Sequence, residues 1–209
     1  VHAALLPQYR GAAPINWAII NGEQQTGITT FFLDEQIDTG KMILREPVDI
    51  PEEANVEYLY NKLMHLGAQM CLQTVDLIIS TDGHAPTLNQ SEFIKAGLTL
   101  RPAPKIYKET CQINWNQPSK KVYDFIRGLS PHPGSWGIVN GTEPMEVKVF
   151  QTTKTVLPCT AKSGTLKADK KHLYVATADT WLEIHELQVA GKRRMNAADF
   201  INGMRNKLS

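Results

Sequence analysis

The sequence has little cysteine, no long hydrophobic run and no basic-then-apolar stretch at its start. Its three cysteines are widely spaced and form no Cys-x-x-Cys pair, which argues against a disulfide framework and a zinc site. No run of about 18 apolar residues and no basic-then-apolar leader occurs, so we expect neither a membrane partner nor a signal peptide. These absences favour a cytoplasmic protein without a metal.

Length and composition are those of an ordinary soluble protein of one or two domains: 209 residues, 42% hydrophobic and 21% charged. The net charge of +1 conceals a split. Residues up to Tyr107 carry 7 Lys and Arg against 12 Asp and Glu, and those from Lys108 onward carry 15 against 9. The split indicates an acidic enzymatic half and a basic half that binds a polyanion, or ordinary drift between two domains.

The first residues read as half of a βαβ unit. Residues 14–22 open on proline and close on Asn-Gly, as a short helix prefers, and residues 26–33 are β-branched and aromatic, as in a buried strand. The first strand of the unit would then lie just upstream of Val1 and run parallel to residues 26–33. His2 and Asp38 would each follow a strand's carboxyl end, so we expect them to meet over one crevice.

An imidazole that faces a carboxylate suits acyl transfer to an amine. Histidine has an ordinary pKa of about 6.5, so it takes and returns a proton near neutrality, and a carboxylate beside the ring favours its charged form. The alternative is a surface histidine and a turn aspartate that never meet.

The residues around this pair resemble the folate-dependent formyltransferases. The match is His-x-x-Leu-Leu-Pro-x-Tyr-Arg-Gly from His2, followed by the apolar strand and by Asp-Glu-x-x-Asp-Thr-Gly from Asp34. The resemblance implies that His2 and Asp38 are two of three catalytic residues. The third, an asparagine, would lie one position before Val1, so we expect the chain to be the latter part of a longer polypeptide and to be inactive alone.

The same resemblance implies a pocket for 10-formyltetrahydrofolate as co-substrate. The residues implied to line it are Ala4, Leu5, Leu6, Pro7, Gly11, Asp34, Gln36 and Gly40. Two residues depart from the family pattern, because Ala4 stands where serine is usual and Gln36 where glycine is common. Ala4 lacks a hydroxyl that could bond the ligand or its own loop, and Gln36 restricts a position where glycine would allow a positive φ.

Further along, the composition predicts a scaffold and then a linker. Residues 42–50 read as a strand, at a sheet edge because of Pro47. Asn55 is predicted to cap a long amphipathic helix with Leu59, Leu63, Leu66, Met70 and Leu77 on its apolar face. His65 beside that face is expected to be a hydrogen-bonded structural histidine or a surface residue. The expected domains are 1–100, the carboxyl-terminal half of a catalytic domain; 101–110, a stiff linker; and 111–209, a basic β-barrel.

The residue pattern of the second half predicts short strands, separated by turns, of the kind that form a small β-barrel. We expect strands at 145–150, 165–168, 173–177 and 181–189, helices at 119–127 and 196–205 (the latter capped by Asn196), and a Gly/Pro-rich corner at 131–137. The fold class is therefore α/β: part of a Rossmann-like formyltransferase domain with a mostly parallel sheet, followed by a small OB-like barrel.

A basic cluster lies between the last strand and the last helix. Lys192, Arg193 and Arg194 are adjacent, and Lys162 and Lys167 belong to the same half. Such cations can neutralise phosphates, and the resemblance extends to Gly-Lys-x-Arg-Met at this place, which implies tRNA binding. A solvated loop is the alternative.

The resemblance implies transfer of a formyl group from 10-formyltetrahydrofolate to the methionine amino group of initiator methionyl-tRNA, for translation initiation, by a protein expected to be monomeric at full length. Two other functions stay open. One is formylation of an amino-sugar nucleotide, and the other is a non-catalytic RNA-binding module, which the departures at Ala4 and Gln36 leave open.

Overall fold

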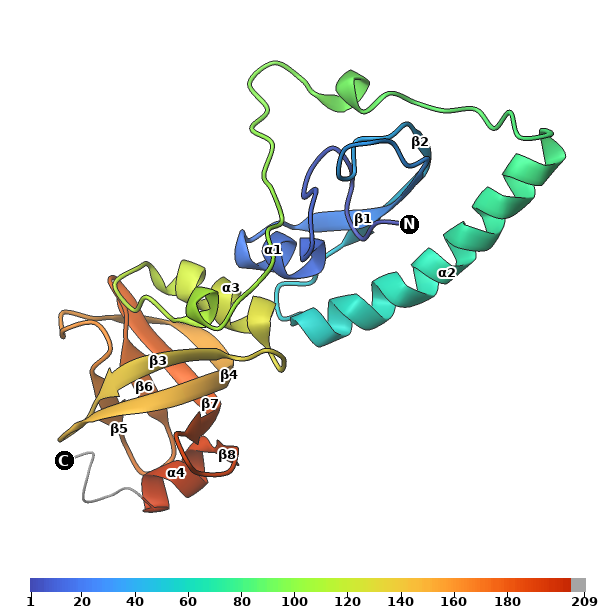
Figure 1. Cartoon of the computed structure of the whole chain (residues 1–209). Helices are drawn as coiled ribbons and strands as arrows, with labels where there is room; N and C mark the ends of the chain where they lie inside the picture. Colours follow the sequence, from blue (N-terminus) through green and yellow to red (C-terminus); the bar gives the residue numbers. More distant parts are fainter. Residues whose placement is uncertain (204–209) are drawn as a thin grey trace. The chain divides into compact units, whose positions relative to one another are not determined.

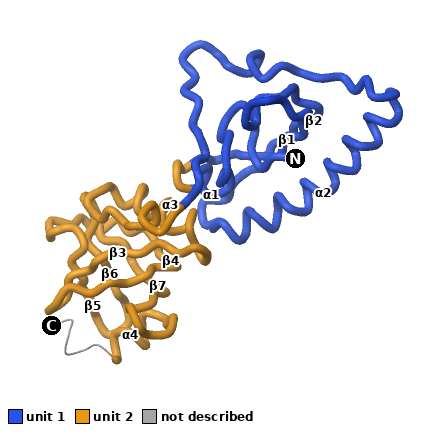
Figure 2. Tube along the Cα trace, in the orientation of Figure 1, with its two compact units in different colours: residues 1–19, 23–106 blue, residues 20–22, 107–209 orange. Residues whose placement is uncertain are grey.

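The computed structural model describes residues 1–203, which fold into two compact units (Figure 2). The first unit comprises residues 1–19 and 23–106, and the second comprises residues 20–22 and the chain from Tyr107 onward. Each unit has its own cluster of buried apolar side chains. The boundary lies within residues 101–110, and the roles of the two units remain predictions.

The first unit contains the four elements expected from the sequence, with somewhat different ends (Figure 1). They are α1 (Pro14–Ile20), β1 (Gln25–Phe31), β2 (Met42–Asp49) and α2 (Val56–Ser80). The unit also contains a 3₁₀ helix that the sequence does not predict, η1 (Gln90–Phe93).

The cap and the apolar face of α2 are confirmed. The Asn55 side chain accepts a hydrogen bond from the Tyr58 N–H at 2.9 Å, which satisfies a free donor of the first turn. Leu59, Leu63 and Met70 are buried. His65 is exposed, as expected.

The expected parallel pairing at the start of the chain is wrong. His2 and Thr29 exchange both main-chain hydrogen bonds, at 2.8 and 2.9 Å, which is the pattern of an antiparallel pair. β1 also pairs antiparallel with β2, with Gly27 opposite Pro47. The physical reason is that α1, with only seven residues, does not return the chain along the length of a strand, so β1 runs back against the segment of His2.

The second unit is a six-stranded sheet flanked by short helices. Its elements are η2 (Glu109–Cys111), α3 (Ser119–Leu129), β3 (Ser135–Asn140), β4 (Pro144–Pro158), β5 (Leu166–Ala168), β6 (Leu173–Ala176), β7 (Thr180–Val189), β8 (Met195–Asn196) and α4 (Ala197–Gly203). Helix α3 and strands β4 to β7 were expected, although β4 is longer. The cap of α4 is confirmed, because the Asn196 side chain accepts from the Asp199 N–H at 2.8 Å. The last two residues of the helix expected at 196–205 lie outside the described residues.

The corner expected at 131–137 is wrong in part, because β3 begins at Ser135. Trp136 and Val139 of this strand lie opposite Lys148 and Met145 of β4, and the pairing overrides the turn tendency of the Gly/Pro-rich sequence.

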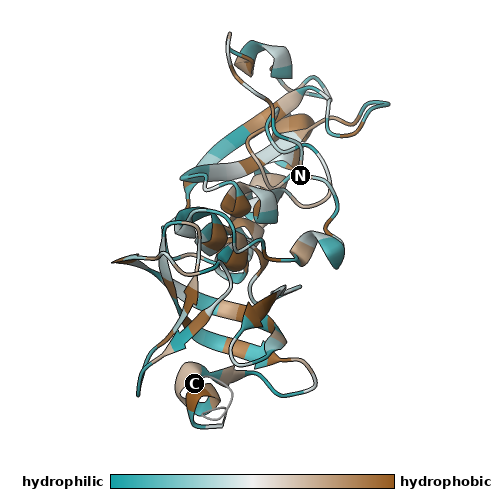
Figure 3. Ribbon diagram, turned by 90° about the vertical axis from the view of Figure 1, so that its left-hand side faces the viewer, coloured by the Kyte–Doolittle hydropathy of each residue, from teal (hydrophilic) through white to brown (hydrophobic). Residues whose placement is uncertain are grey.

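The strands of this sheet follow the order β3-β4-β7-β6-β5, with β8 beside β7, and all these pairs are antiparallel. Strand residues alternate between hydrophilic and hydrophobic (Figure 3), as expected for a sheet with one face on a core. A single bridge between Asn140 and Thr165 links the two edge strands at one end. The described strands therefore approach a barrel without a closed ladder.

Candidate active site

His2 is buried, and its orientation is fixed by main-chain groups. Its Nε2 lies 2.8 Å from the Tyr9 carbonyl oxygen. A carbonyl oxygen only accepts, so Nε2 must carry the hydrogen, and Nδ1 is left as the basic nitrogen of the neutral ring. Tyr9 turns its carbonyl to His2 with a φ of 59°, in the left-handed region.

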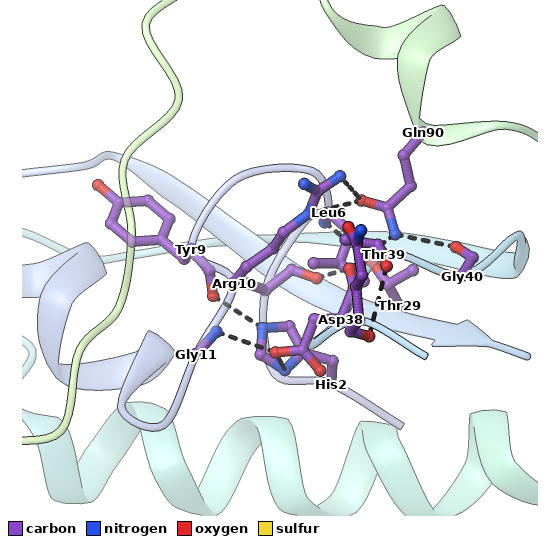
Figure 4. A network of polar contacts seen from close by, with 12 residues as sticks. His2, Leu6, Tyr9, Arg10, Gly11, Thr29, Asp38, Thr39, Gly40 and Gln90 are labelled. Carbon is purple, nitrogen blue, oxygen red and sulfur yellow. Dashed lines mark hydrogen bonds and ion pairs between the residues drawn. The ribbon is translucent and has the colours of Figure 1, made fainter. Parts of the chain in front are cut away.

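Asp38 faces the free nitrogen of this ring (Figure 4). Its Oδ2 lies 3.7 Å from His2 Nδ1 and accepts a hydrogen bond of 2.9 Å from the Gly11 N–H. The expected meeting of His2 and Asp38 is therefore observed. The separation is longer than a hydrogen bond, so the contact between the carboxylate and the ring is electrostatic.

The loop that carries Asp38 is a tight turn held by its own side chains. Asp34 Oδ1 accepts from the Gln36 N–H at 3.1 Å and from the Thr39 hydroxyl at 2.6 Å. Among the described residues of this loop, Asp38 adopts a positive φ, 56°, and Gln36 does not. Glutamine in place of glycine at residue 36 therefore imposes no left-handed strain.

The Leu5-Leu6-Pro7 segment is held by Thr29 of β1. The Thr29 hydroxyl donates to the Ala4 carbonyl oxygen at 2.7 Å and accepts from the Leu6 N–H at 3.1 Å. Ala4 and Leu6 are fully buried, and the Ala4 methyl packs in the core of the unit. Alanine in place of the usual serine at residue 4 is therefore a substitution within the core.

Arg45 supports the same segment from β2. Its Nε donates to the Leu6 carbonyl oxygen at 3.2 Å, and its guanidinium lies 4.9 Å from the centre of the Phe93 ring. Burial lowers the pKa of Arg45 from its usual value. The motif did not single out Arg45, because its contacts come from separate elements of the chain.

Gly11 and Gly40 lie where the backbone approaches other main-chain atoms closely. A Cβ on Gly11 would lie 2.4 Å from the Ala103 oxygen, and one on Gly40 would lie 1.7 Å from the Phe32 oxygen. Both glycines were expected to line a ligand pocket. The structure gives both glycines a role in shaping the two loops around His2 and Asp38, and their place in a folate pocket stays a prediction.

The basic residues do not form one cluster. Lys192 and Arg193 line a pocket of about 150 Å³ with Asp199 and Phe200, beyond the carboxyl end of β7. Lys162 lines a separate pocket with residues of the turn that precedes β7. A strand of ten residues spans roughly 30 Å, so the two groups lie at opposite ends of β7.

Two of the basic residues predicted to bind tRNA, Arg194 and Lys167, contact other side chains of the second unit. Arg194 forms a bidentate ion pair with Glu186, with both contacts at 2.6 Å, and stacks at 4.1 Å on the Phe150 ring. The Lys167 ammonium lies 5.5 Å from the Trp181 ring. Arg194 would have to leave a carboxylate in order to bind a phosphate.

In the described part of the chain, no helix is both long and apolar enough to cross a membrane. Within residues 1–203, no three His, Cys, Asp or Glu side chains gather in a way that could hold a metal ion.

Two protein-family models match this chain. "Formyl transferase" matches residues 1–75, which include His2 and Asp38, and "Formyl transferase, C-terminal domain" matches residues 105–205. The chain belongs to the formyltransferase family.

Among curated members of the family, the methionyl-tRNA formyltransferase of Parabacteroides distasonis is 47% identical over 208 residues, and that of Bacteroides fragilis is 49% identical over 206 residues. These matches cover 98% and 97% of this chain but 64% and 63% of the relatives. The chain thus spans about two thirds of the length of the family members it matches.

Two solved structures share the fold at lower identity. HypX from Aquifex aeolicus in complex with tetrahydrofolic acid superposes with a TM-score of 0.67 and 20% identity, over 96% of this chain and 34% of that one. An N-formyltransferase from Helicobacter canadensis, in complex with folinic acid and dTDP-3-aminofucose, gives 0.67 and 18% over 93% and 65%.

Proposed function

We propose that the full-length protein transfers a formyl group from 10-formyltetrahydrofolate to the α-amino group of methionine on initiator tRNA. The observation that carries the proposal is the buried His2, with its basic nitrogen held 3.7 Å from the Asp38 carboxylate. Identities of 47% and 49% to methionyl-tRNA formyltransferases support this acceptor over an amino sugar. We further propose that the first unit joins a larger, mostly parallel sheet and that the second is an OB-like tRNA-binding domain.

His2 acts as the proton carrier in the proposed reaction. An α-amino group has an ordinary pKa near 8, so a sizeable minority is neutral at pH 7 and ready to attack. The amine nitrogen forms a bond to the formyl carbon, the bond from that carbon to the folate nitrogen breaks, and the proton lost by the amine reaches the folate nitrogen through His2 Nδ1.

Asp38 stabilises the charged ring while it holds this proton. At 3.7 Å and an effective dielectric constant of about 20, carboxylate and imidazolium attract each other by about 4 kcal/mol. Half of that attraction, if realised only in the transition state, corresponds to about 30-fold in rate. The Gly11 N–H keeps Oδ2 in place, so this geometry exists before the ring is charged.

The first test compares variants of these two residues in the full-length protein. We expect His2→Ala to lower kcat by about 10²–10⁴-fold, and Asp38→Asn to lower it by at least about 30-fold, with unfolding temperatures near that of the wild type. His65→Ala is the matched control, because His65 is exposed on α2, and it should retain full activity. Near-normal transfer by His2→Ala or Asp38→Asn would refute the assignment.

The second test concerns the acceptor. Labelled formyl transfer is measured to methionyl-tRNA and to an amino-sugar nucleotide, each at two salt concentrations. Transfer to tRNA alone that weakens with salt is the expected result, because phosphate contacts release counterions. Transfer to the sugar alone would keep His2 and Asp38 but change the role of the second unit, and transfer to neither would favour a binding module.

A further inference from the structure

The 3₁₀ helix η1 is fixed beside the candidate active site by its own flanking residues. Leu88 and Met42 exchange main-chain hydrogen bonds of 2.8 and 2.9 Å, which attach the segment to the start of β2. The Glu92 carboxylate accepts from the Asn89 N–H at 3.3 Å and from its side-chain amide at 3.1 Å, which closes the first turn. The side chain of Gln90 is thereby given a definite direction.

Gln90 is buried and uses its whole amide group. Its Nε2 donates to the Asp38 carbonyl oxygen at 2.8 Å and to the Gly40 carbonyl oxygen at 2.9 Å (Figure 4). Its Oε1 accepts from Arg10 Nε at 3.1 Å and from Nη2 at 2.7 Å. One amide therefore connects the loop that carries Asp38 to Arg10. Arg10 lies between Tyr9, whose carbonyl oxygen contacts His2, and Gly11, whose N–H donates to Asp38.

The bond to Asp38 bears directly on its carboxylate. Asp38 has a φ of 56°, which residues other than glycine seldom adopt without support from their surroundings. The Gln90 amide holds the carbonyl oxygens of Asp38 and Gly40, and so fixes the peptide plane that follows each of these two residues. If these bonds are lost, the backbone is free to relax toward ordinary φ values, and Oδ2 moves away from His2 Nδ1.

Only an amide of this length satisfies all four partners. A carboxylate would accept from Arg10 but would set its lone pairs against two carbonyl oxygens, and a thioether would do neither. The alternative to a role in positioning is a structural one, in which Gln90 only holds the fold together and its loss lowers stability without changing the chemistry.

We propose that Gln90 is a positioning residue for formyl transfer, which acts through Asp38 by holding the two loops around the His2–Asp38 pair in register. The proposal rests on the proposed function, since it assigns Gln90 to the same reaction.

The test is a double-mutant cycle in the full-length protein with Gln90→Met and Asp38→Asn. Because a displacement of about 1 Å can cost about 10²-fold in rate, we expect Gln90→Met to lower kcat by about 10–10²-fold while the KM values for both substrates change less than about 3-fold. In the Asp38→Asn background the same change should lower kcat by less than about 3-fold, because the carboxylate that it positions is gone. Equal losses in the two backgrounds would overturn the proposal.

Two further variants cover failure to fold. Gln90→Glu keeps the Arg10 contact and gains an ion pair, so it should fold and still lose at least about 10-fold in kcat; full activity in a folded Gln90→Glu would overturn the proposal. Gln25→Met is the matched control, because Gln25 is exposed and donates to the Asp49 side chain, and it should behave as wild type. If Asp38→Asn is itself fully active, the proposed function fails; if Asp38→Asn is impaired but Gln90→Met is not, only the role of Gln90 fails.

Discussion

Gly40→Ala tests how closely the Asp38 loop is fitted to the strand before it. The added Cβ would lie 1.7 Å from the Phe32 carbonyl oxygen and 2.8 Å from its carbonyl carbon. Cβ atoms do not approach other atoms to less than 3.0 Å, so one side must move by about 1.3 Å. The opposing atoms belong to the backbone and cannot rotate away, whereas residues 34–37 of the loop are exposed. We expect the loop to yield.

The effects on activity and stability should differ greatly in size. Overpacking costs about 1–3 kcal/mol, and an exposed loop that can move should be at the lower end, about 1 kcal/mol. That would lower the Tm by about 2–4 °C and leave nearly all molecules folded. A movement of this size next to Asp38 should lower kcat by about 10²-fold, because its carboxylate would leave the reach of His2 Nδ1.

The assay is single-turnover formyl transfer at 25 °C, together with thermal unfolding of the same samples. Gly67→Ala is the control, because a Cβ on Gly67 would meet only ordinary contacts at 3.6 and 3.7 Å, and alanine suits the middle of α2. A wild-type rate of formyl transfer by Gly40→Ala, or a loss of activity only in proportion to the unfolded fraction, would contradict the close fit of the loop to Phe32.

Two other predictions concern the second unit. Hydrogen bonds from the Ser119 and Thr180 N–H groups lower the pKa of Asp179 in the folded protein. The ionised carboxylate therefore stabilises the fold above the pKa of about 3.9 that an aspartate has in the unfolded chain. This contribution is lost as the pH falls through the lower pKa of the folded state. The difference in Tm between wild type and Asp179→Asn should therefore shrink between pH 6 and pH 3, and a constant difference would contradict the linkage. In tRNA binding, Lys192→Gln should reduce the slope of log K against log salt concentration by about 0.7–0.9. Arg194→Gln should leave that slope unchanged and lower the Tm, because Arg194 is paired with Glu186. Equal slopes for the two variants would count against this distinction.

Local signals in the sequence predicted the parts of the fold that depend on near neighbours. The cap at Asn55 and the apolar face of α2 could be predicted because both arise within a few helical turns. The sequence also predicts the approach of His2 to Asp38, although through a parallel pairing that the antiparallel His2–Thr29 bridge contradicts. Two loops at the same edge of a sheet can meet whether the strands are parallel or antiparallel. His2 and Asp38 therefore lie close together although the predicted strand orientation is wrong.

The sequence did not predict features that depend on contacts between distant segments. The sequence predicts a corner over part of β3, because Gly134 and the prolines before it favour a turn. The pairing with β4 that extends the chain is not a local property of the sequence. Gln90 gave no signal, because a glutamine in a polar stretch looks like any surface residue. Its role arises from Arg10, 80 positions earlier, and from the loop of Asp38.

The two left-handed residues on either side of the candidate active site have an energetic consequence. Tyr9 and Asp38, at φ values of 59° and 56°, each cost about 1–2 kcal/mol relative to an ordinary backbone. The folded chain bears that cost before any substrate arrives, so substrate binding does not have to supply it. Stability and reactivity therefore compete at these residues. Glycine would relieve the backbone at either one, but it would also remove the Tyr9 hydroxyl that bonds Glu23, or the carboxylate that faces His2.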